Sequence, residues 1–518
     1  MIGKLLKMVK SSNKKRGRNI TVGAVVGMLL SCSSVMKADE FLWIRGNGGE
    51  IEYNTAVTND KDGTDGNWSK ENPYSERNTM ENGTYTNNIT LSGTNNGKKY
   101  GSLLGYGLRF SGDLKELNFI NNGNINADLS KSGDSSYGIY VDSVDSMGDI
   151  ENNGNIQAIV SGGYSGSGIY ISSTEKVGNI INNGNINTFT NDSGKYLYGI
   201  YLTAKETGNV INNGNIRSYD VNSDITLLYG MNLIINNNIE NNGSILAGAP
   251  NDSRGDATGV RAAGNNIVNN GDIRAYSGDE SYGICADNIG NIINNGSISA
   301  FASDFTNYSN IRRGKFGIIL SGGSKVGNVV NTGVIFGGGG IIEIRENGNI
   351  DLVSNCGMYI VGFGASITSG VGNATTTKDY GMNITNANEN PYTDNTDKDF
   401  VVTLGDEAEE LAGAGGKTTV TMGFDGNTEL ERKMTIKNAK LDGESGTATD
   451  TIEFSTTGEY DNHILNGKYN TITVTGDGKI EGSVINAFGT AVLFGDSGKK
   501  LTLSGSIVNG GVSNILLE

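Results

Sequence analysis

The stretch GNIINNGNI at residues 178–186 returns as GNVINNGNI at residues 208–216, and this recurring phrase sets the architecture of the chain. Looser copies occur before and after it, each centred on Asn-Asn-Gly. The glycines of these copies are Gly123, Gly154, Gly184, Gly214, Gly243, Gly271 and Gly296, and Gly333 closes a variant Asn-Thr-Gly. Most are spaced by close to 30 residues. An internal period of this size indicates a solenoid, a propeller or a repeat array.

The residues around each glycine alternate as they would in a β-strand. Every copy has Ile two positions after the glycine, a small residue four positions after it, and an apolar residue four positions before it. The isoleucines are Ile125, Ile156, Ile186, Ile216, Ile245, Ile273, Ile298 and Ile335. Side chains two apart share one face of a strand. Each Asn-Asn-Gly is therefore expected to be a tight corner between two strands, where Asn and Gly tolerate left-handed backbone angles.

A third frame follows the corners. It reads Tyr-Gly-Ile-Tyr at residues 137–140 and 198–201, and Ser-Gly-Ile-Tyr at residues 167–170. No helical period lies between the frames, so the repeat predicts three short strands. The predicted fold is all-β: a right-handed parallel β-helix, or β-solenoid, with one coil per repeat of about 30 residues. A leucine-rich repeat would need Leu at the framework positions, and a propeller blade would need four strands.

The strict frame covers only part of the 518 residues, and it suggests a division of the chain. We expect a signal peptide at residues 1–38, an N-terminal cap or solenoid start at 39–117, and the Asn-Asn-Gly β-helix at 118–340. Residues 341–400 read as irregular coils with a polar insertion, and residues 401–518 as a looser β-helix.

The first 38 residues have the pattern of an export signal. A basic segment from Lys4 to Arg18 precedes the short apolar run ITVGAVVGMLLS at residues 20–31. That run is too short for a comfortable membrane span and suits the core of a signal peptide. Cleavage after Ala38 is expected. The alternative is lipidation at Cys32, because Leu-Leu-Ser-Cys loosely fits a lipid-attachment site.

Charge and cysteine content narrow the class further. The leader holds eight Lys or Arg and no acid, so its removal from a chain of net charge −16 leaves −24. A body that acidic repels nucleic acid, and no nucleic-acid partner is expected. Outside the leader, Cys285 and Cys356 are the only cysteines. They support neither a disulfide scaffold nor a zinc site, and two buried free thiols are expected.

With its leader, its NNGNI coils and its strands rich in Gly, Ser, Thr and Asn, the chain resembles the passenger region of type V autotransporters, which are surface proteins of Gram-negative bacteria. The resemblance covers nearly the whole chain. It implies a right-handed β-helix that is threaded through an outer-membrane translocator barrel. It also implies a location at the cell surface, in the outer membrane or outside the cell.

One feature departs from that family. Its members end in a translocator barrel of alternating amphipathic strands that closes on an aromatic residue, whereas this sequence ends in GSIVNGGVSNILLE at residues 505–518. A barrel needs about ten residues in each of many strands, and the last hundred residues still resemble a solenoid. The translocator barrel is therefore expected as a partner outside this sequence, either because the sequence is a fragment or because the barrel is encoded separately.

The candidates for catalysis and metal binding are weak. His463 is the only histidine, and Gly495-Asp496-Ser497-Gly498 matches a serine-protease phrase without a domain that would orient a triad. The acidic residues Asp60, Asp62, Asp65 and Glu71 lack the glycine position and the flanking helices of a calcium loop. We expect no enzyme activity, no metal and no cofactor.

The candidate for recognition is Arg254-Gly255-Asp256, the tripeptide that integrins bind. It lies between the corner at Gly243 and the strand at Val260, where a protruding loop is expected. The tripeptide is short enough to occur by chance in a chain rich in Gly and Asp. Residues 128–136, 189–197 and 249–257 are the variable loops that would extend from the coils.

Three functions fit these patterns. The leading hypothesis is an exported surface adhesin that contacts host or bacterial surface receptors through loops on a stiff stack of coils. The first alternative is a carbohydrate-active β-helix enzyme, which would need a groove with several convergent carboxylates. The second is a structural surface protein without a specific receptor.

Overall fold

A computed structural model of the chain describes much of its length. It covers residues 41–47, 50–56, 78–81, 83–93, 97–99, 102–129, 135–160, 164–190, 196–220, 227–249, 255–302, 314–361, 368–379, 382–386, 399–404 and 433–437, and the strands named below between 450 and 517. The chain divides into the units Met1–Asp39 and Glu40–Glu518. The described residues all belong to the second unit.

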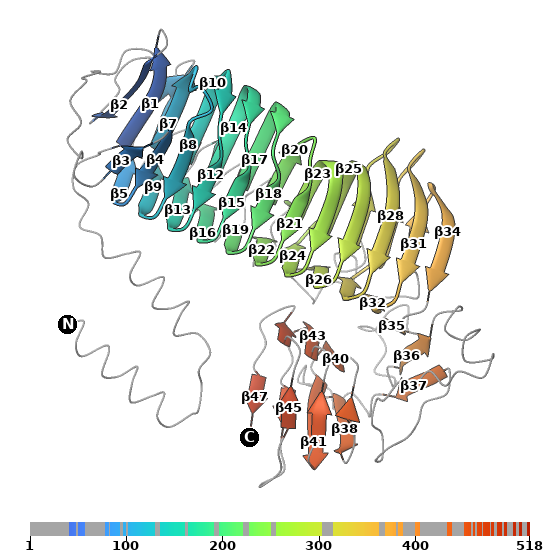
Figure 1. Cartoon of the computed structure of the whole chain (residues 1–518). Coiled ribbons are helices and arrows are strands. Elements are labelled where there is room, and N and C mark those ends of the chain that lie inside the picture. The colour runs from blue at the N-terminus through green and yellow to red at the C-terminus, as the bar shows by residue number, and fades with distance from the viewer. Residues whose placement is uncertain are drawn as a thin grey trace, which may run out of the picture. The chain divides into compact units, whose positions relative to one another are not determined.

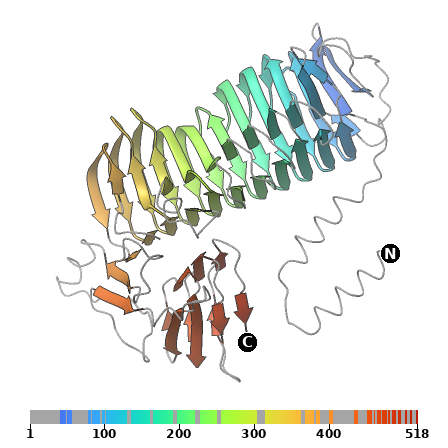
Figure 2. The ribbon, with the colours of Figure 1, turned by 180° about the vertical axis from the view of Figure 1, so that it is seen from behind.

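The described residues form a parallel β-solenoid, as predicted. Each coil has three strands, and each strand pairs in parallel with its counterpart one coil later, for example Ile169 with Ile200 and Ile186 with Ile216. Figure 1 shows successive coils side by side from β7 to β34, and Figure 2 shows them from behind. The three frames found in the sequence are therefore the three strands of one coil.

We call the strand of the Tyr-Gly-Ile-Tyr frame the first strand, and the strands before and after the corner the second and third. The first strands are β7 (Ser102–Gly112), β10 (Ser135–Val144), β14 (Ser165–Val177), β17 (Tyr196–Thr207), β20 (Leu227–Ile234), β23 (Asp256–Asn269), β25 (Ser281–Asn294), β27 (Lys315–Leu320), β30 (Gly340–Ile344) and β33 (Thr368–Gly370). In β23 and β25 the first strand continues without a break into the second.

The second strands end at the corner. They are β4 (Thr84–Asn87), β8 (Asn118–Asn121), β12 (Ile150–Asn152), β15 (Ile180–Asn182), β18 (Val210–Asn212), β21 (Ile239–Asn241), β28 (Lys325–Asn331), β31 (Asn349–Asn355) and β34 (Asn373–Asp379), with β11 (Ser146–Met147) just before β12. The third strands are β5 (Thr90–Gly93), β9 (Asn124–Leu129), β13 (Asn155–Val160), β16 (Asn185–Thr190), β19 (Asn215–Asp220), β22 (Ser244–Gly248), β24 (Asp272–Ser277), β26 (Ser297–Ala302), β29 (Val334–Gly337), β32 (Met358–Val361) and β35 (Met382–Asn386).

Antiparallel strands flank the parallel coils. Near the N-terminal end, β1 (Phe41–Asn47) pairs in parallel with β7 and antiparallel with β2 (Glu50–Ala56). The strands β3 (Asn78–Glu81) and β6 (Gly97–Lys99) pair antiparallel with β4 and β7. After the last coil, β36 (Asp399–Leu404) runs antiparallel to β35, and β37 (Lys433–Lys437) antiparallel to β36. Such pairings use strand edges that a parallel stack would leave open.

A second set of parallel coils follows in residues 450–517. One face holds β38 (Asp450–Thr456), β41 (Asn470–Gly476), β44 (Val492–Phe494) and β47 (Ile515–Leu517). The other faces hold β39 (Glu459–Tyr460), β42 (Gly478–Ile480) and β45 (Leu501–Leu503), and β40 (Ile464–Lys468), β43 (Val484–Phe488) and β46 (Ile507–Asn509). Ile452 pairs with Ile472 and Ile472 with Val492, so these coils are shorter than the others.

The core is a column of aliphatic side chains inside the coils. The isoleucine that follows each corner is fully buried, as is the isoleucine of the first strand, for example Ile186 and Ile169. Burying one such side chain contributes about 1.5–3 kcal/mol, so identical residues stacked coil on coil provide most of the stability. The predicted inward positions of all three strands are confirmed.

The corner glycines serve a different purpose from the one expected. None of the Asn-Asn-Gly residues has a positive φ, so the expected left-handed backbone at the corner is wrong. The corners of adjacent coils instead approach closely, and a Cβ on Gly184 would lie 1.9 Å from the carbonyl oxygen of Gly154. The first strand has a similar constraint, because a Cβ on Gly199 would lie 2.2 Å from Cγ2 of Ile216. Glycine is required at both places because there is no room for a side chain.

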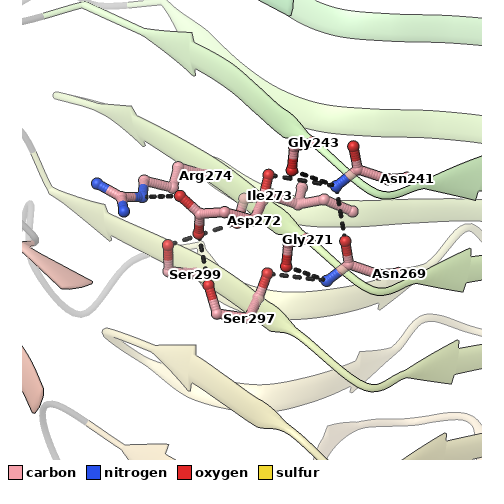
Figure 3. A network of polar contacts seen from close by, with 9 residues as sticks. All are labelled: Asn241, Gly243, Asn269, Gly271, Asp272, Ile273, Arg274, Ser297 and Ser299. Carbon is pink, nitrogen blue, oxygen red and sulfur yellow. Dashed lines mark hydrogen bonds and ion pairs between the residues drawn. The ribbon is translucent and has the colours of Figure 1, made fainter. Parts of the chain in front are cut away.

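The first asparagine of each corner is fully buried and forms a ladder along the coils. Its Nδ2 donates to Oδ1 of the equivalent residue one coil later, as from Asn182 to Asn212 at 2.8 Å and from Asn241 to Asn269 at 2.7 Å. The same Nδ2 donates to the carbonyl oxygen two residues on, for example that of Gly243 (Figure 3). These bonds satisfy a polar group that would be costly to bury alone.

The second asparagine of the corner forms an exposed ladder that runs the other way. Asn213 Nδ2 donates to Asn183 Oδ1 in the preceding coil at 2.8 Å, and Asn242 donates to Asn213 at 2.9 Å. Buried amides therefore donate toward the C-terminus, and exposed amides toward the N-terminus. Both ladders fix the register of one coil on the next.

The buried ladder includes more residues than the asparagines of the Asn-Asn-Gly corners. It begins at Asn87, in the phrase Asn-Asn-Ile, and continues beyond Asn331 to Asn355, in the phrase Asn-Cys-Gly. Asn355 then donates to Asp379 Oδ1 at 2.9 Å. A carboxylate accepts hydrogen bonds and donates none, so Asp379 is the last acceptor of the ladder.

We predict that Asn212→Asp strongly destabilises the coils. The new carboxylate would be buried and would face the acceptors Asn241 Oδ1 and the carbonyl oxygen of Gly214 without a proton to donate. The expected loss is about 3 kcal/mol or more. The matched control is Asn213→Asp in the exposed ladder, where solvent hydrates the new carboxylate and the expected loss is about 1 kcal/mol, that of one hydrogen bond. Urea unfolding followed by circular dichroism measures both, and equal midpoint shifts would contradict the assigned role of the buried ladder.

Candidate functional site

The outward side of the first strands carries two rows of aromatic residues. In one row Tyr106 pairs with Tyr137, and in the other Tyr170 pairs with Tyr201. Tyr137 and Tyr140 are three residues apart, yet their ring centroids are 4.8 Å apart, while Ile139 between them is in the core. The alternation of inward and outward side chains is therefore interrupted between Gly138 and Ile139, so both tyrosines lie on the outward side of the strand. We call this surface the aromatic face.

The rings of the aromatic face stack along the direction of the coils. Tyr170 and Tyr201 have centroids 4.8 Å apart and nearly parallel planes, and Tyr198 and Tyr229 are 5.3 Å apart at 6°. Each such contact contributes about 0.5–1.5 kcal/mol beyond the area it buries. Neighbouring rings cover one another's faces, and these tyrosines are buried or half-buried, so little of their surface remains for a ligand.

The hydroxyls of Tyr140 and Tyr170 stay protonated at physiological pH. Burial raises the pKa of Tyr170 to about 12, and it also raises the pKa of Tyr140. The Tyr140 hydroxyl donates to a carboxylate oxygen of Asp142 at 3.1 Å. At the N-terminal end of the face, the Arg109 guanidinium lies 4.5 Å from the centre of the Trp43 ring. These contacts hold the aromatic face together.

In the later coils charged residues lie beside the aromatic row, which continues at Tyr282 and Phe316. Arg261 Nε lies 2.8 Å from a carboxylate oxygen of Asp287. In the next coil, the Tyr282 hydroxyl donates a hydrogen bond to Glu280 at 2.5 Å and accepts one from Arg345 Nη2 at 2.9 Å. These groups neutralise one another in pairs, so they hold a network together and leave little net charge for an ionic ligand.

The two cysteines differ in their surroundings. Cys285 is part of this charged region, where its sulfur lies 3.6 Å from Ser321 Oγ. Burial raises the pKa of the Cys285 thiol, which keeps it protonated and unreactive. Cys356 is exposed, which corrects the expectation of two buried thiols. The reason is its position in Asn-Cys-Gly, where it occupies the place of the exposed second asparagine of a corner.

The coils vary most in length at one corner. Second and third strands are joined through the two-residue corner, for example Asn183 and Gly184 between β15 and β16. The connection from a third strand to the next first strand is three residues from β24 to β25 and twelve from β26 to β27. The predicted variable loops 128–136, 189–197 and 249–257 all fall at this connection, which we call the loop corner.

Tyr164 lies beside the loop corner and is the most exposed tyrosine among the described residues. It is 52% exposed, and its ring is 5.4 Å from that of Tyr196 in the next coil, tilted by 53°. Unlike the stacked tyrosines, Tyr164 keeps ring surface open to a partner. The loop corner therefore combines variable connections with an accessible aromatic pair.

The structure gives only part of the Arg254-Gly255-Asp256 tripeptide. Arg254 lies outside the described residues. Gly255 is buried, and Asp256 is the first residue of β23, where it pairs with Leu227. These two residues thus belong to the wall of the coil and not to the apex of a protruding loop. Integrin-type recognition by this tripeptide stays a prediction.

The carboxyl group of Asp256 has unusual surroundings. Burial, together with the negative charges of Glu280 and Asp279, raises its pKa to about 6, and Lys315 opposes this shift. Lys315 itself is fully buried. A carboxylate in this environment is destabilising once it is ionised.

The predicted corner glycines, from Gly123 to Gly333, all lie at corners between second and third strands. Other candidate residues lie outside the described residues: Cys32 and the leader, Asp60, Asp62, Asp65, Glu71, His463 and the segment 495–498. Within the described part of the chain, no group of three or more His, Cys, Asp or Glu side chains is placed to hold a metal ion. That part also contains no helix with the length and apolar character of a membrane span.

No protein-family model matches the chain, and neither the curated proteins nor the solved structures provide a match. The fold and the features of its surface are thus the basis for assigning a function.

The sequence contains a signal for the aromatic face, namely the recurrence of tyrosines within the third frame. Tyr137 and Tyr140 recur as Tyr198 and Tyr201, which is a fixed offset of two coils, and Tyr106 and Tyr229 extend the same series. What the sequence did not show is that positions three residues apart point to one side. That arrangement depends on the interruption at the Gly-Ile step.

We predict that Asp256→Asn stabilises the coils in a pH-dependent way. The folded chain holds the proton of Asp256 up to about pH 6, whereas the unfolded chain releases it at a lower pH, so stability falls as the pH rises through that interval. The variant should therefore melt at a higher temperature than the unchanged protein near neutral pH, and the gap should close below about pH 4. Asp351→Asn, at an exposed residue, is the control for losing one negative charge. A gap that is the same at both pH values would contradict the prediction.

Proposed function

We propose that the chain is the surface-exposed, adhesive part of an exported protein, which contacts receptors on host or bacterial cells through the loop corner. The observation that carries this proposal is the wide variation in connection length at that corner, from two residues between β29 and β30 to twelve between β26 and β27. A rigid stack of coils with variable connections on one side is the arrangement in which repeat proteins present binding residues.

The surroundings of the loop corner support the proposal. Tyr164 and Tyr196 form an accessible aromatic pair there, and aromatic residues are enriched at the centres of protein interfaces. The coils beneath are held by amide ladders and stacked rings, so these side chains would lose little conformational entropy when a receptor binds. Preorganisation of this kind favours recognition over a purely mechanical function.

Export rests on the sequence of the leader. The basic segment, the short apolar run and Ala38 before Asp39 are typical of a signal peptide, with lipidation at Cys32 as the other route. The resemblance to autotransporter passengers agrees with a location at the cell surface or outside the cell. A translocator barrel would then serve its secretion.

The proposal is tested by the binding of the purified full chain to epithelial cells and to bacterial cells. The double variant Tyr164→Ser and Tyr196→Ser should lower the affinity by about tenfold, because two aromatic side chains leave the contact. Val371→Ser is the matched control, since Val371 is 79% exposed and lies away from the loop corner.

Arg254→Ala tests the tripeptide in the same assay. Loss of binding in this variant alone would indicate integrin-type recognition. If the unchanged chain binds neither cell type, or if the tyrosine pair and Val371 variants bind alike, the adhesive function of the loop corner is wrong.

A further inference from the structure

The outward side of the second strands has a composition of its own. Three rows of residues run across the coils there, each with one residue per coil. The central row is Ile120, Glu151, Ile181, Ile211, Glu240, Val268, Ile293 and Val330. The row on the side of the first strand is Asn118, Asp149, Asn179, Asn209, Asn238, Asn266, Asn291 and Asn328, and the row at the corner is Asn122, Asn153, Asn183, Asn213, Asn242, Asn270, Asn295 and Thr332. We call these rows together the amide-flanked stripe.

The central row is apolar and partly exposed. Its members face one another from coil to coil, since Ile181 pairs with Ile211, and Val268 with Ile293. Each is half-buried, although its neighbours on either side in the strand point inward. β-Branched residues favour strands, but Thr would serve the strand equally well and would be better hydrated. Isoleucine and valine at most of these positions therefore leave an apolar stripe open to solvent.

The flanking rows are amides held in place by one another. At the corner, Asn183 Nδ2 donates to Asn153 Oδ1 at 2.8 Å. On the other flank, Asn291 donates to Asn266 at 2.7 Å and Asn328 to Asn291 at 2.6 Å. Each amide retains hydrogen-bonding capacity toward solvent, because it has two N–H groups and two lone pairs. The side chains are already ordered, so a ligand would lose little entropy by binding them.

The stripe repeats once per coil, and the coils are about 4.8 Å apart. A matching partner needs an apolar surface between two polar edges, with the same repeat. An extended glycan of equatorially linked pyranose rings has these properties: the C–H groups form its faces, the hydroxyl groups form its edges, and it advances by nearly the same step per sugar. In Figure 1 the strands β8, β12, β15, β18 and β21 lie side by side along this direction.

The charges of the stripe select among such glycans. Asp149, Glu151 and Glu240 are its only ionisable residues, and all three are acidic. They disfavour uronic acids and sulfated sugars. Glu240 accepts from Asn242 Nδ2 at 2.8 Å, so its carboxylate is part of the amide network and can also accept hydrogen bonds from hydroxyl groups. The complementary partner is uncharged and rich in hydroxyl groups.

We propose that the amide-flanked stripe binds a neutral, extended β-linked polysaccharide that lies along the coils with about one sugar ring per coil. This surface is on the second strands, so the inference goes beyond receptor binding at the loop corner and does not depend on it. Repeated weak contacts along several coils would give the affinity.

The experiment measures binding of the full chain to hydroxyethylcellulose and to chitin oligosaccharides of increasing length. Affinity should rise with the number of sugar rings, and polygalacturonate and dextran should not bind. The double variant Ile181→Thr and Ile211→Thr should weaken binding by about tenfold, because two apolar contacts are reduced while the strands are retained. Ile234→Thr is the matched control, since Ile234 is 55% exposed and ends a first strand.

Circular dichroism and the urea midpoint verify that the variants are folded. If neither neutral β-linked ligand binds the unchanged chain, or if the Ile181 and Ile211 variant binds as the Ile234 variant does, the proposal is overturned. A concentration-dependent dimer that the double variant abolishes would assign the stripe to self-association and would also overturn it. Loss of cell binding in the Tyr164 and Tyr196 variant has no bearing on these measurements, so the two proposals fail separately.

Discussion

The structure depends on the need to satisfy a buried amide at every corner. Asn212 is fully buried, and its Nδ2 reaches the carbonyl oxygen of Gly214 and the Oδ1 of Asn241 in the next coil. These partners exist only if adjacent coils are in register. A slip by one residue would turn the asparagine outward and bring the other set of side chains into the core. The amide thus selects one register, and the stacked isoleucines supply the free energy that holds it.

The outer surfaces follow from that register. Equivalent outward residues of successive coils become neighbours, so a tyrosine repeated in sequence becomes a stack of rings, and a repeated asparagine becomes an amide ladder. Side chains that would be isolated on a compact domain are thereby ordered by copies of themselves. The loop corner differs because its connections vary most in length, and we propose it as the receptor-binding region for that reason.

Much of the coil could be predicted from the sequence, because its determinants are local. The period, the three strands and the inward isoleucines follow from alternation around each glycine, as at Ile186 and Ile216. The extent of the ladder could not, because Asn355 is followed by Cys and Asp379 is not an asparagine. Asn355 and Asp379 can be identified as members of the ladder only from the residues that contact them in the preceding coil.

The candidate site was harder to predict for the same reason. Gly255 and Asp256 read as a loop in the sequence, yet Gly255 is buried and Asp256 begins β23, a strand whose place is set by pairing with Leu227 and its neighbours. The rise in the pKa of Asp256 comes first from its burial and then from the charges of Glu280 and Asp279, which are a coil away. The corner glycines were identified correctly, but their cause is the approach of two backbones and not the conformation of one residue.

The opposite directions of the two corner ladders have an electrostatic consequence. Buried amides such as Asn212 donate toward the C-terminus, and exposed amides such as Asn213 donate toward the N-terminus. In an α-helix, aligned peptide dipoles add up to partial charges at the two ends. Here the side-chain dipoles of each coil oppose one another, so adding coils does not build up a dipole from these two rows. The corner can therefore repeat through many coils without a growing dipole from its two asparagines.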